Sequence, residues 1–333
     1  MTIRRTISDL PNGWPPDRNP RFAHLLAEKW RRENDQRRAD HVPSGALFSA
    51  SNAGKCSRYL SYRAVGIADS DPMDLTGHHN VTLGNIIHDA WQEAMAEAAP
   101  DYGFPAAEVS FEVEHRFLDG RGIAIVDAVL RFPEGGEYVE APISDAHPSG
   151  DGGCPDKVIA YELKSTGGFG FKGAVGKVSR GKPAEGPRNE AVLQGAIGAL
   201  CANADELIVG VIAKEAISAS YGMAEIDRFT AEWTLTRDQY QPLAELEIKR
   251  VEAILGLVAD GHLAARKIPG VAGEIVDPLS GRFEVRDANG TVVDVGTTWQ
   301  CDYCSARTLC AATPSGRIPV ETAVYLRAKL EVE

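Results

Sequence analysis

The sequence lacks long apolar runs, and no segment approaches the about 20 consecutive apolar residues that a membrane-spanning helix requires. The first residues, Met1 to Thr6, also lack the apolar core of a secretory signal. We therefore expect a cytoplasmic protein without membrane association. Thiols stay reduced in that compartment, so the six cysteines are not expected to form a disulfide framework.

Positive charge is scarce, because 35 Lys and Arg residues stand against 47 Asp and Glu residues, giving a net charge of −12. This balance argues against a broad nucleic-acid surface, which needs clustered cations. Local basic runs nevertheless occur at residues 29–38 and 164–188. A site that collects carboxylates around metal ions would also make the total negative, so the net charge excludes neither function.

Internal repeats and low-complexity tracts are absent as well, and the composition is that of an ordinary globular protein with enough residues for a sizeable core. Hydrophobic periodicity predicts an α/β fold with a central mixed β-sheet of about five strands, flanked by helices. Predicted helices cover residues 83–98, 189–202 and 237–259, and predicted strands cover 109–117, 122–132, 158–164, 206–213 and 228–235. We expect four segments: an N-terminal arm (1–45), a segment with Cys56 near the start of a short helix (46–82), a core (83–260) and a C-terminal segment (261–333).

The strand at Val158–Lys164 ends in Glu-x-Lys, although a buried strand should end in apolar residues. Side chains two apart on a strand share a face, so Glu162 and Lys164 point the same way and Tyr161 faces the opposite layer. A carboxylate beside an ammonium can hold a metal ion and aim a water molecule. A surface salt bridge at a strand end is the competing interpretation.

Three further polar side chains interrupt apolar elements: His88 on the first core helix, Asp127 on the second strand and Gln194 on the following helix. Asp127 is expected on one face with Ile123, Ile125 and Val129. Each residue also has a simpler explanation. His88 could be a half-buried histidine on a helix, and Gln194 an ordinary helix residue. Asp127 could cap a turn or pair with Arg131. As a set, the carboxylates offer hard oxygen ligands for Mg²⁺ or Mn²⁺, to which histidine adds affinity for Mn²⁺.

These motifs, Gly84-x-x-x-His88, Asp127 in its strand and Tyr161-Glu162-x-Lys164, resemble the PD-(D/E)XK nucleases. The likeness is to the RecB-like exonucleases with their CRISPR-associated, iron–sulfur-containing branch, and a phage or mobile-element origin stays open. The resemblance implies a restriction-endonuclease-like core and metal-dependent hydrolysis of DNA, most of all at single-stranded ends.

The resemblance assigns metal binding to His88, Asp127, Glu162 and the Leu163 carbonyl, and catalysis to Lys164. The helix at Gln194 resembles the family's glutamine motif, which implies a role in positioning DNA or orienting the lysine. One departure is Gly198, because the family usually has a tyrosine four residues after that glutamine.

Cys301-x-x-Cys304-x5-Cys310 gathers three soft ligands, and Cys56 is the expected fourth. The spacing alone leaves open a zinc site with four cysteine ligands, and also unligated thiols. The resemblance favours a 4Fe–4S cluster that pins the N- and C-terminal segments into a helical subdomain. Cys154 and Cys201 are interpreted as incidental.

The expected partners are DNA and, by resemblance, recombination or CRISPR-adaptation proteins, and a homo-oligomer is also allowed. Phosphate contacts are predicted for the loop at 169–188 and for Arg58, for which a structural ion pair is the alternative. Two other classes of function stay open. One is a catalytically weak DNA-binding accessory module, and the other is a zinc-stapled structural protein.

Overall fold

The computed structural model describes residues 25, 28–33, 36, 45–71, 73–98, 108–132, 157–176, 183–218, 223–271 and 273–330. Contacts divide the chain into two compact units, Met1–Val42 with Met73–Thr82, and Pro43–Pro72 with Leu83–Glu333. In the first unit, residues 28–33 are helical and the Trp30 ring lies 4.7 Å from the His79 ring. The predicted arm falls almost entirely outside the described residues, and the predicted boundaries at 46, 83 and 261 stay predictions.

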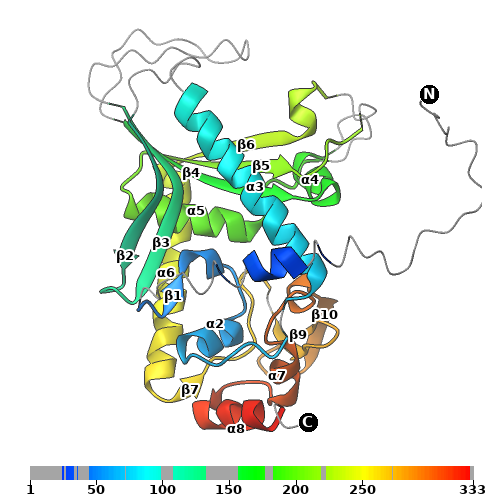
Figure 1. Ribbon diagram of the computed structural model, residues 1–333. Helices are drawn as coiled ribbons and strands as arrows, with labels where there is room; N and C mark the ends of the chain where they lie inside the picture. The colour runs from blue at the N-terminus through cyan, green and yellow to red at the C-terminus, as the bar shows by residue number, and fades with distance from the viewer. Residues whose placement is uncertain are drawn as a thin grey trace, which may run out of the picture. The chain divides into compact units, whose positions relative to one another are not determined.

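The second unit contains a mixed β-sheet, which confirms the predicted α/β class (Figure 1). Its described strands run in the order β1-β3-β4-β5-β6, with β2 pairing on β3. The β1/β3 and β4/β5 pairs are parallel, whereas β2/β3, β3/β4 and β5/β6 are antiparallel. The strands are β1 (Phe48–Ser49), β2 (Glu108–Phe117), β3 (Gly122–Phe132), β4 (Lys157–Thr166), β5 (Glu206–Ala213) and β6 (Thr230–Thr236).

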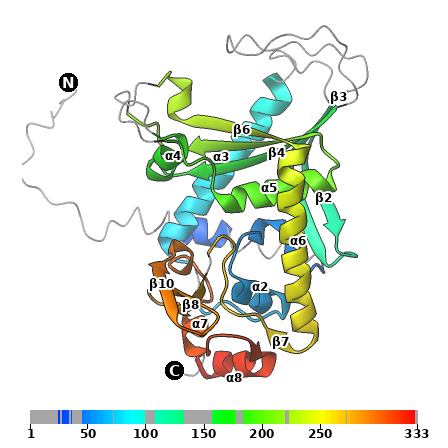
Figure 2. The same ribbon diagram turned by 180° about the vertical axis from the view of Figure 1, so that it is seen from behind.

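Helices cover both faces of this sheet (Figures 1 and 2). Helix α3 (Leu75–Ala98) lies over one face, where the ring of Trp91 is 5.4 Å from that of Tyr161. Helices α5 (Asn189–Cys201) and α6 (Arg237–Ala259) cover the other face, and both were predicted to within one residue. No helix among the described residues is both long and apolar enough to cross a membrane.

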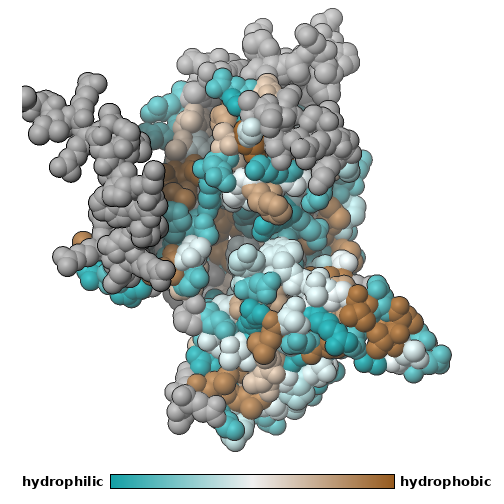
Figure 3. All heavy atoms as spheres, turned by 90° about the vertical axis from the view of Figure 1, so that its right-hand side faces the viewer, coloured by the Kyte–Doolittle hydropathy of each residue, from teal (hydrophilic) through white to brown (hydrophobic). Residues whose placement is uncertain are grey.

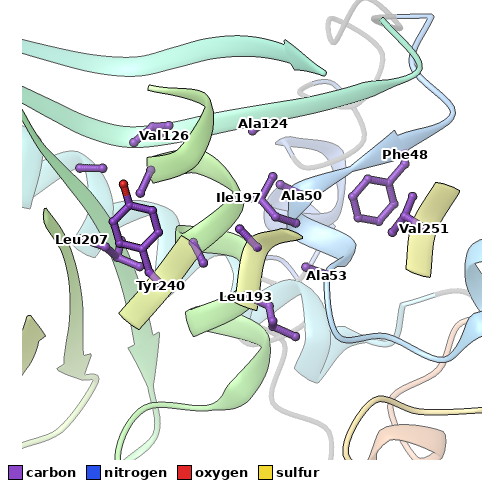
Figure 4. Close-up of a cluster of buried hydrophobic side chains, with 14 of the residues drawn as sticks. Phe48, Ala50, Ala53, Ala124, Val126, Leu193, Ile197, Leu207, Tyr240 and Val251 are labelled. Atoms are coloured by element: carbon purple, nitrogen blue, oxygen red, sulfur yellow. The ribbon is translucent and has the colours of Figure 1, made fainter. Parts of the chain in front are cut away.

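Helix α5 packs unusually close to the sheet because glycines face it. A side-chain carbon at Gly195 would lie 2.9 Å from Glu162 Cβ, and one at Gly198 would lie 3.0 Å from Val126 Cγ2. Around these contacts, Val126, Ile197 and Leu207 form part of a core that continues to α6 (Figure 4). The close approach fixes the backbone of β4 against a rigid helix.

The N- and C-terminal segments of the second unit pack together, as predicted. Tyr62 and Ile67 share a buried cluster with Leu263, Leu309 and Ile318. The elements involved are α2 (Ser57–Ala64), β7 (His262–Leu263), α7 (Arg307–Ala312), β11 (Ile318–Pro319) and α8 (Val320–Leu330). Beside them, β9 (Arg282–Arg286) and β10 (Val292–Thr297) form a hairpin, with β8 (Glu274–Asp277) as a third strand. Three short 3-10 helices also occur among the described residues: η2 (Ala50–Asn52), η6 (Ile226–Arg228) and η7 (Trp299–Cys301).

Two helix predictions were incomplete. Helix α3 begins at Leu75 rather than Leu83, because the Asp74 side chain accepts a hydrogen bond from the Gly77 amide at 2.7 Å and caps the helix. Helix α4 (Gly168–Val175) occupies a stretch that we expected to be a loop. Its glycines mask the helical pattern, but Phe171 and Ala174 are buried, and Phe171 packs against β5.

Arg58 is a structural residue, and the predicted phosphate contact is wrong. Its side chain is 0% exposed, its Nε donates to the Ala264 carbonyl at 2.6 Å, and Nη1 donates to the Thr313 hydroxyl at 3.1 Å. Nη2 donates to the Gly316 carbonyl. The partners are neutral oxygens rather than the predicted carboxylate, and the guanidinium joins α2 to the C-terminal segment.

Replacing Arg58 with alanine should therefore lower the free energy of unfolding by about 3 kcal/mol, because several buried acceptors would lose their donor. Chemical denaturation followed by circular dichroism measures this loss. Arg63 offers a matched control on the same helix, since it is 48% exposed in an ion pair with Asp69. A loss for Arg58→Ala no larger than that for Arg63→Ala would contradict this role.

Candidate active site

A pocket of about 320 Å³ opens beside the carboxyl half of β4. Its walls come from α3, the middle of β2 and the end of β4. They are formed by Gly84, Asn85, Ile87, His88, Glu112, Leu163, Lys164 and Ser165. A cavity between a helix and the end of a strand is a position where polar side chains from separate elements can meet.

Glu162 and Lys164 point to the same side of β4, as predicted, and their Oε1 and Nζ atoms are 2.5 Å apart. The Glu162 side chain is 2% exposed and Lys164 is 38% exposed, so the carboxylate is buried and the ammonium reaches the pocket. Burial raises the pKa of Glu162 to about 8, against the opposing effect of Lys164. Burial lowers the pKa of Lys164, but Glu162 and Asp127 outweigh it and the net direction is upward. Tyr161 faces the opposite layer, as expected, where its ring packs against that of Trp91 on α3.

Asp127 connects the strand pair to α3. One carboxylate oxygen accepts a hydrogen bond from the Leu163 amide at 2.7 Å, and the other lies 3.2 Å from His88 Nε2. The hydrogen bond to Asp127 raises the pKa of His88, in opposition to burial. The structure therefore brings His88 from α3, Asp127 from β3, and Glu162 and Lys164 from β4 to one place.

The pocket also contains Glu112, which the sequence analysis did not single out. Glu112 has a left-handed backbone with φ 50° inside β2, and its charge raises the pKa of His88. Phe111 pairs with Ala128 and Val113 with Val126, so Glu112 lies opposite Asp127 at a break between them. Alternating polar residues in β2 made Glu112 look like one more solvent-facing side chain.

The break at Glu112 and Asp127 exchanges the faces of both strands. Ala128 and Phe111 belong to the apolar cluster under α3, whereas Val126 and Val113 pack in the core under α5. Our expectation that Ile123, Ile125 and Val129 share one apolar face with Asp127 is therefore wrong, and Ile125 is 38% exposed. Regular alternation fails where the left-handed residue turns the strand.

Replacing Glu112 with glycine should relieve about 1 kcal/mol of backbone strain while removing the carboxylate. If Glu112 serves the pocket, Glu112→Gly and Glu112→Gln should both weaken Mn²⁺ binding, and only the first should raise stability. Calorimetric titration and thermal unfolding measure the two effects. Asp119→Gly is the matched control, because Asp119 has φ 55° at the β2–β3 turn, away from the pocket. Mn²⁺ binding that is unchanged in both Glu112 variants would remove Glu112 from the site.

The donor set fits a hard divalent cation, although no three His, Cys, Asp or Glu side chains of the described residues surround a common metal position. Each carboxylate instead has a local partner, Lys164 for Glu162 and His88 for Asp127. Glu162 Oε1 is buried and lacks a hydrogen bond of regular geometry within the described part of the chain. A buried carboxylate oxygen in this state is suited to a cation that competes with the lysine.

Gln194 does not join this group. It is half-buried on α5, next to Gly195, which packs against Glu162, and no contact joins its side chain to His88, Asp127 or Lys164 among the described residues. Gly198, where the resemblance expects a tyrosine, lies against Val126, and a large side chain has no room there. The close packing of α5 thus accounts for the glycine.

The four predicted cluster cysteines gather between α2 and the C-terminal segment. Cys56 immediately precedes α2. Burial raises the pKa of Cys301, and negative charge on Cys56, Cys304 and Cys310 raises it further, to about 12, so the four thiols are neighbours. All four are free thiols, and none of the described residues forms a closed metal cage. Holding a metal group would require these side chains to close around it. Cys154 lies outside the described residues, and Cys201 packs against the main core, as expected for a small apolar side chain.

The loop before Cys56 is fixed by a buried ion pair on α6. Glu247, 3% exposed, accepts a hydrogen bond from the Gly54 amide at 2.8 Å and pairs with Arg250 at 2.6 Å. Arg250 also donates to the Ser57 hydroxyl at 2.9 Å. This pair holds both sides of Cys56, which places the thiol independently of any bound metal.

Comparison with known proteins adds little to this picture. The sequence matches no protein-family model and no curated protein. Among solved structures, it is similar to the chain described as "Crystal structure of SSO0001", with 16% identity, 69% of this chain and 87% of that chain covered, and a TM-score of 0.35.

Proposed function

We propose that this protein is a metal-dependent DNA exonuclease that hydrolyses phosphodiester bonds, with preference for single-stranded ends. The observation that carries the proposal is a group of two ion pairs, His88 with Asp127 and Lys164 with the buried Glu162, in which the histidine and the lysine line an open pocket. A surface salt bridge does not account for this arrangement, because Glu162 is buried and an exposed pair would leave both groups in water.

Each residue has a distinct task in this proposal. His88, Asp127 and Glu162, with the Leu163 carbonyl, would hold Mg²⁺ or Mn²⁺, which when bound supplies an activated water and neutralises phosphate charge. Lys164 lines the pocket beside the proposed metal ligands. From there its ammonium group orients the attacking water and stabilises negative charge on the phosphate. The Leu163 amide fixes one oxygen of Asp127, so the other stays directed at His88, which lines the pocket.

The four cysteines support a second, structural part of the proposal. Cys56, Cys301, Cys304 and Cys310 would ligate a 4Fe–4S cluster that joins α2 to the C-terminal segment, with zinc as the competing metal. The support is the gathering of four thiols, each buried or half-buried, from distant parts of the chain. Work within a recombination or adaptation complex is also a proposal.

Substitutions on β4 test the metal site directly. Glu162→Gln keeps the shape but removes the carboxyl group that a bound cation would hold in its ionised form, so it should weaken Mn²⁺ binding by at least about 10-fold. Tyr161→Phe is the matched control on the adjacent residue, because Tyr161 faces Trp91, and it should change binding by less than about twofold. Electron paramagnetic resonance of free Mn²⁺ measures both. Stronger damage from Tyr161→Phe would mean that the opposite face of β4 carries the site.

A further inference from the structure

An exposed aromatic pair lies where the C-terminal segment leaves β10. Trp299 is 46% exposed, Tyr303 is 82% exposed, and their ring centroids are 6.0 Å apart. Trp299 begins the short helix η7, and the Thr298 hydroxyl accepts a hydrogen bond from the Gln300 amide at 3.3 Å and caps it. The backbone therefore presents two large rings at the surface in a fixed arrangement.

A cation accompanies this pair. The guanidinium carbon of Arg188 lies 4.7 Å from the centre of the Trp299 ring, although the two residues are far apart in sequence. Of the acidic side chains nearby, Asp302 lies 3.4 Å from Arg307, whereas Glu190 accepts a hydrogen bond from the neutral Gln300 amide and keeps its charge. Positive charge beside aromatic rings is the combination that binds phosphate and stacked bases together.

Local contacts join this pair to the pocket. Ser165 lines the pocket, and Thr166 follows it at the end of β4. A side-chain carbon at Gly170 would lie 2.5 Å from Thr166 Oγ1 and 3.7 Å from Arg188 Nη2, so glycine lets the guanidinium approach the strand end. The same turn of α4 carries Phe169, which is 91% exposed.

We propose that Phe169, Arg188, Trp299 and Tyr303, here called the aromatic track, bind the single-stranded DNA that leads to the pocket. Bases stack on the aromatic rings, and Arg188 contacts the backbone phosphate. The proposal rests on the proposed nuclease function and adds the residues that bind its substrate outside the pocket. Figure 3 shows the face on the right of Figure 1, where exposed hydrophobic side chains stand among hydrophilic ones.

Single-stranded DNA fits this surface better than a duplex does. In a duplex the base faces are already stacked on one another, so exposed rings gain nothing from them without unpairing. A single strand offers a free π-face at each nucleotide, and any base sequence is accepted. Although the protein carries a net negative charge, the Arg188 guanidinium then supplies positive charge locally for the DNA phosphates.

The test is binding of a fluorescein-labelled oligothymidylate to the full-length protein, followed by anisotropy in EDTA so that no metal-dependent cleavage occurs. Trp299→Ala and Tyr303→Ala should each weaken binding by about 10-fold, and Trp299→Phe should recover most of the loss. Tyr325→Ala is the matched control, because Tyr325 is 69% exposed on α8 and should bind as the wild type does. Since the two aromatic residues flank cysteines, thermal unfolding of each variant verifies that the fold is retained.

The outcomes separate this proposal from the nuclease itself. If Trp299→Ala and Tyr303→Ala bind the oligonucleotide as tightly as Tyr325→Ala does, the aromatic track is overturned. This holds whether or not the wild type cleaves DNA. Equal affinity of the wild type for duplex and single strands also overturns it. Loss of binding in the track variants, together with a wild type that does not cleave with Mn²⁺, keeps the track and rejects the nuclease.

Discussion

Replacing Lys164 with alanine is expected to lower the rate of DNA cleavage by about 10³-fold while leaving the fold intact. Lys164 is 38% exposed at the end of a strand, so its loss leaves no cavity in the core. It does remove the one lysine among the pocket-lining residues, which lies 2.5 Å from Glu162. Digestion of end-labelled single-stranded DNA with Mn²⁺ gives the rate.

The opposite end of the same strand provides the control. Lys157 also pairs with a glutamate, at 2.9 Å from Glu206, and both partners are partly exposed. Lys157→Ala removes the same charge from β4 and should leave cleavage within about twofold of wild type. Similar rates for the two alanine variants would show that Lys164 has no special part in the chemistry.

The second large effect is expected at the cysteines. Cys304→Ser should abolish the absorbance of an iron–sulfur cluster and lower stability markedly. A cluster that joins Cys56 to Cys301 closes a loop of about 245 residues, which corresponds to about 5 kcal/mol of chain entropy. Anaerobic purification, the visible spectrum, metal analysis and thermal unfolding measure these changes together.

Cys201→Ser is the control, because Cys201 is a half-buried free thiol on α5 that lies outside the group of four. It should keep the bound metal and the visible spectrum. If the wild type is colourless and contains zinc, the metal held by the four cysteines is zinc rather than an iron–sulfur cluster. A wild type without bound metal, with equal stability for both serine variants, would contradict a metal staple.

The fold and much of the site were predictable because they depend on local signals. Period-two and period-3.6 patterns gave the strands and helices, and β3, α5 and β5 were located almost to the residue. The Glu-x-Lys motif in the carboxyl half of β4 was informative because a buried apolar strand seldom contains charged residues. His88 and Asp127 were found because each interrupts an otherwise apolar pattern.

The remaining features depend on tertiary contacts that leave no local signal. Glu112 belongs to a regularly alternating strand, and only the left-handed turn opposite Asp127 brings it to the pocket. Arg58 looked like a surface cation because its acceptors are carbonyl oxygens from distant segments. Arg188 and Trp299 are separated by more of the chain than any sequence pattern spans, and their contact needs the fold.

The most direct test of the account is digestion of end-labelled linear DNA by the wild-type protein with Mn²⁺, with Mg²⁺ and with EDTA. Single-stranded and duplex substrates are compared in parallel, and Glu162→Gln serves as the reference without a metal site. The account predicts loss of label from single-stranded ends with either metal, no loss in EDTA, and no loss with Glu162→Gln. Metal-independent digestion, or intact DNA with a wild type that binds Mn²⁺ at the pocket, would contradict it.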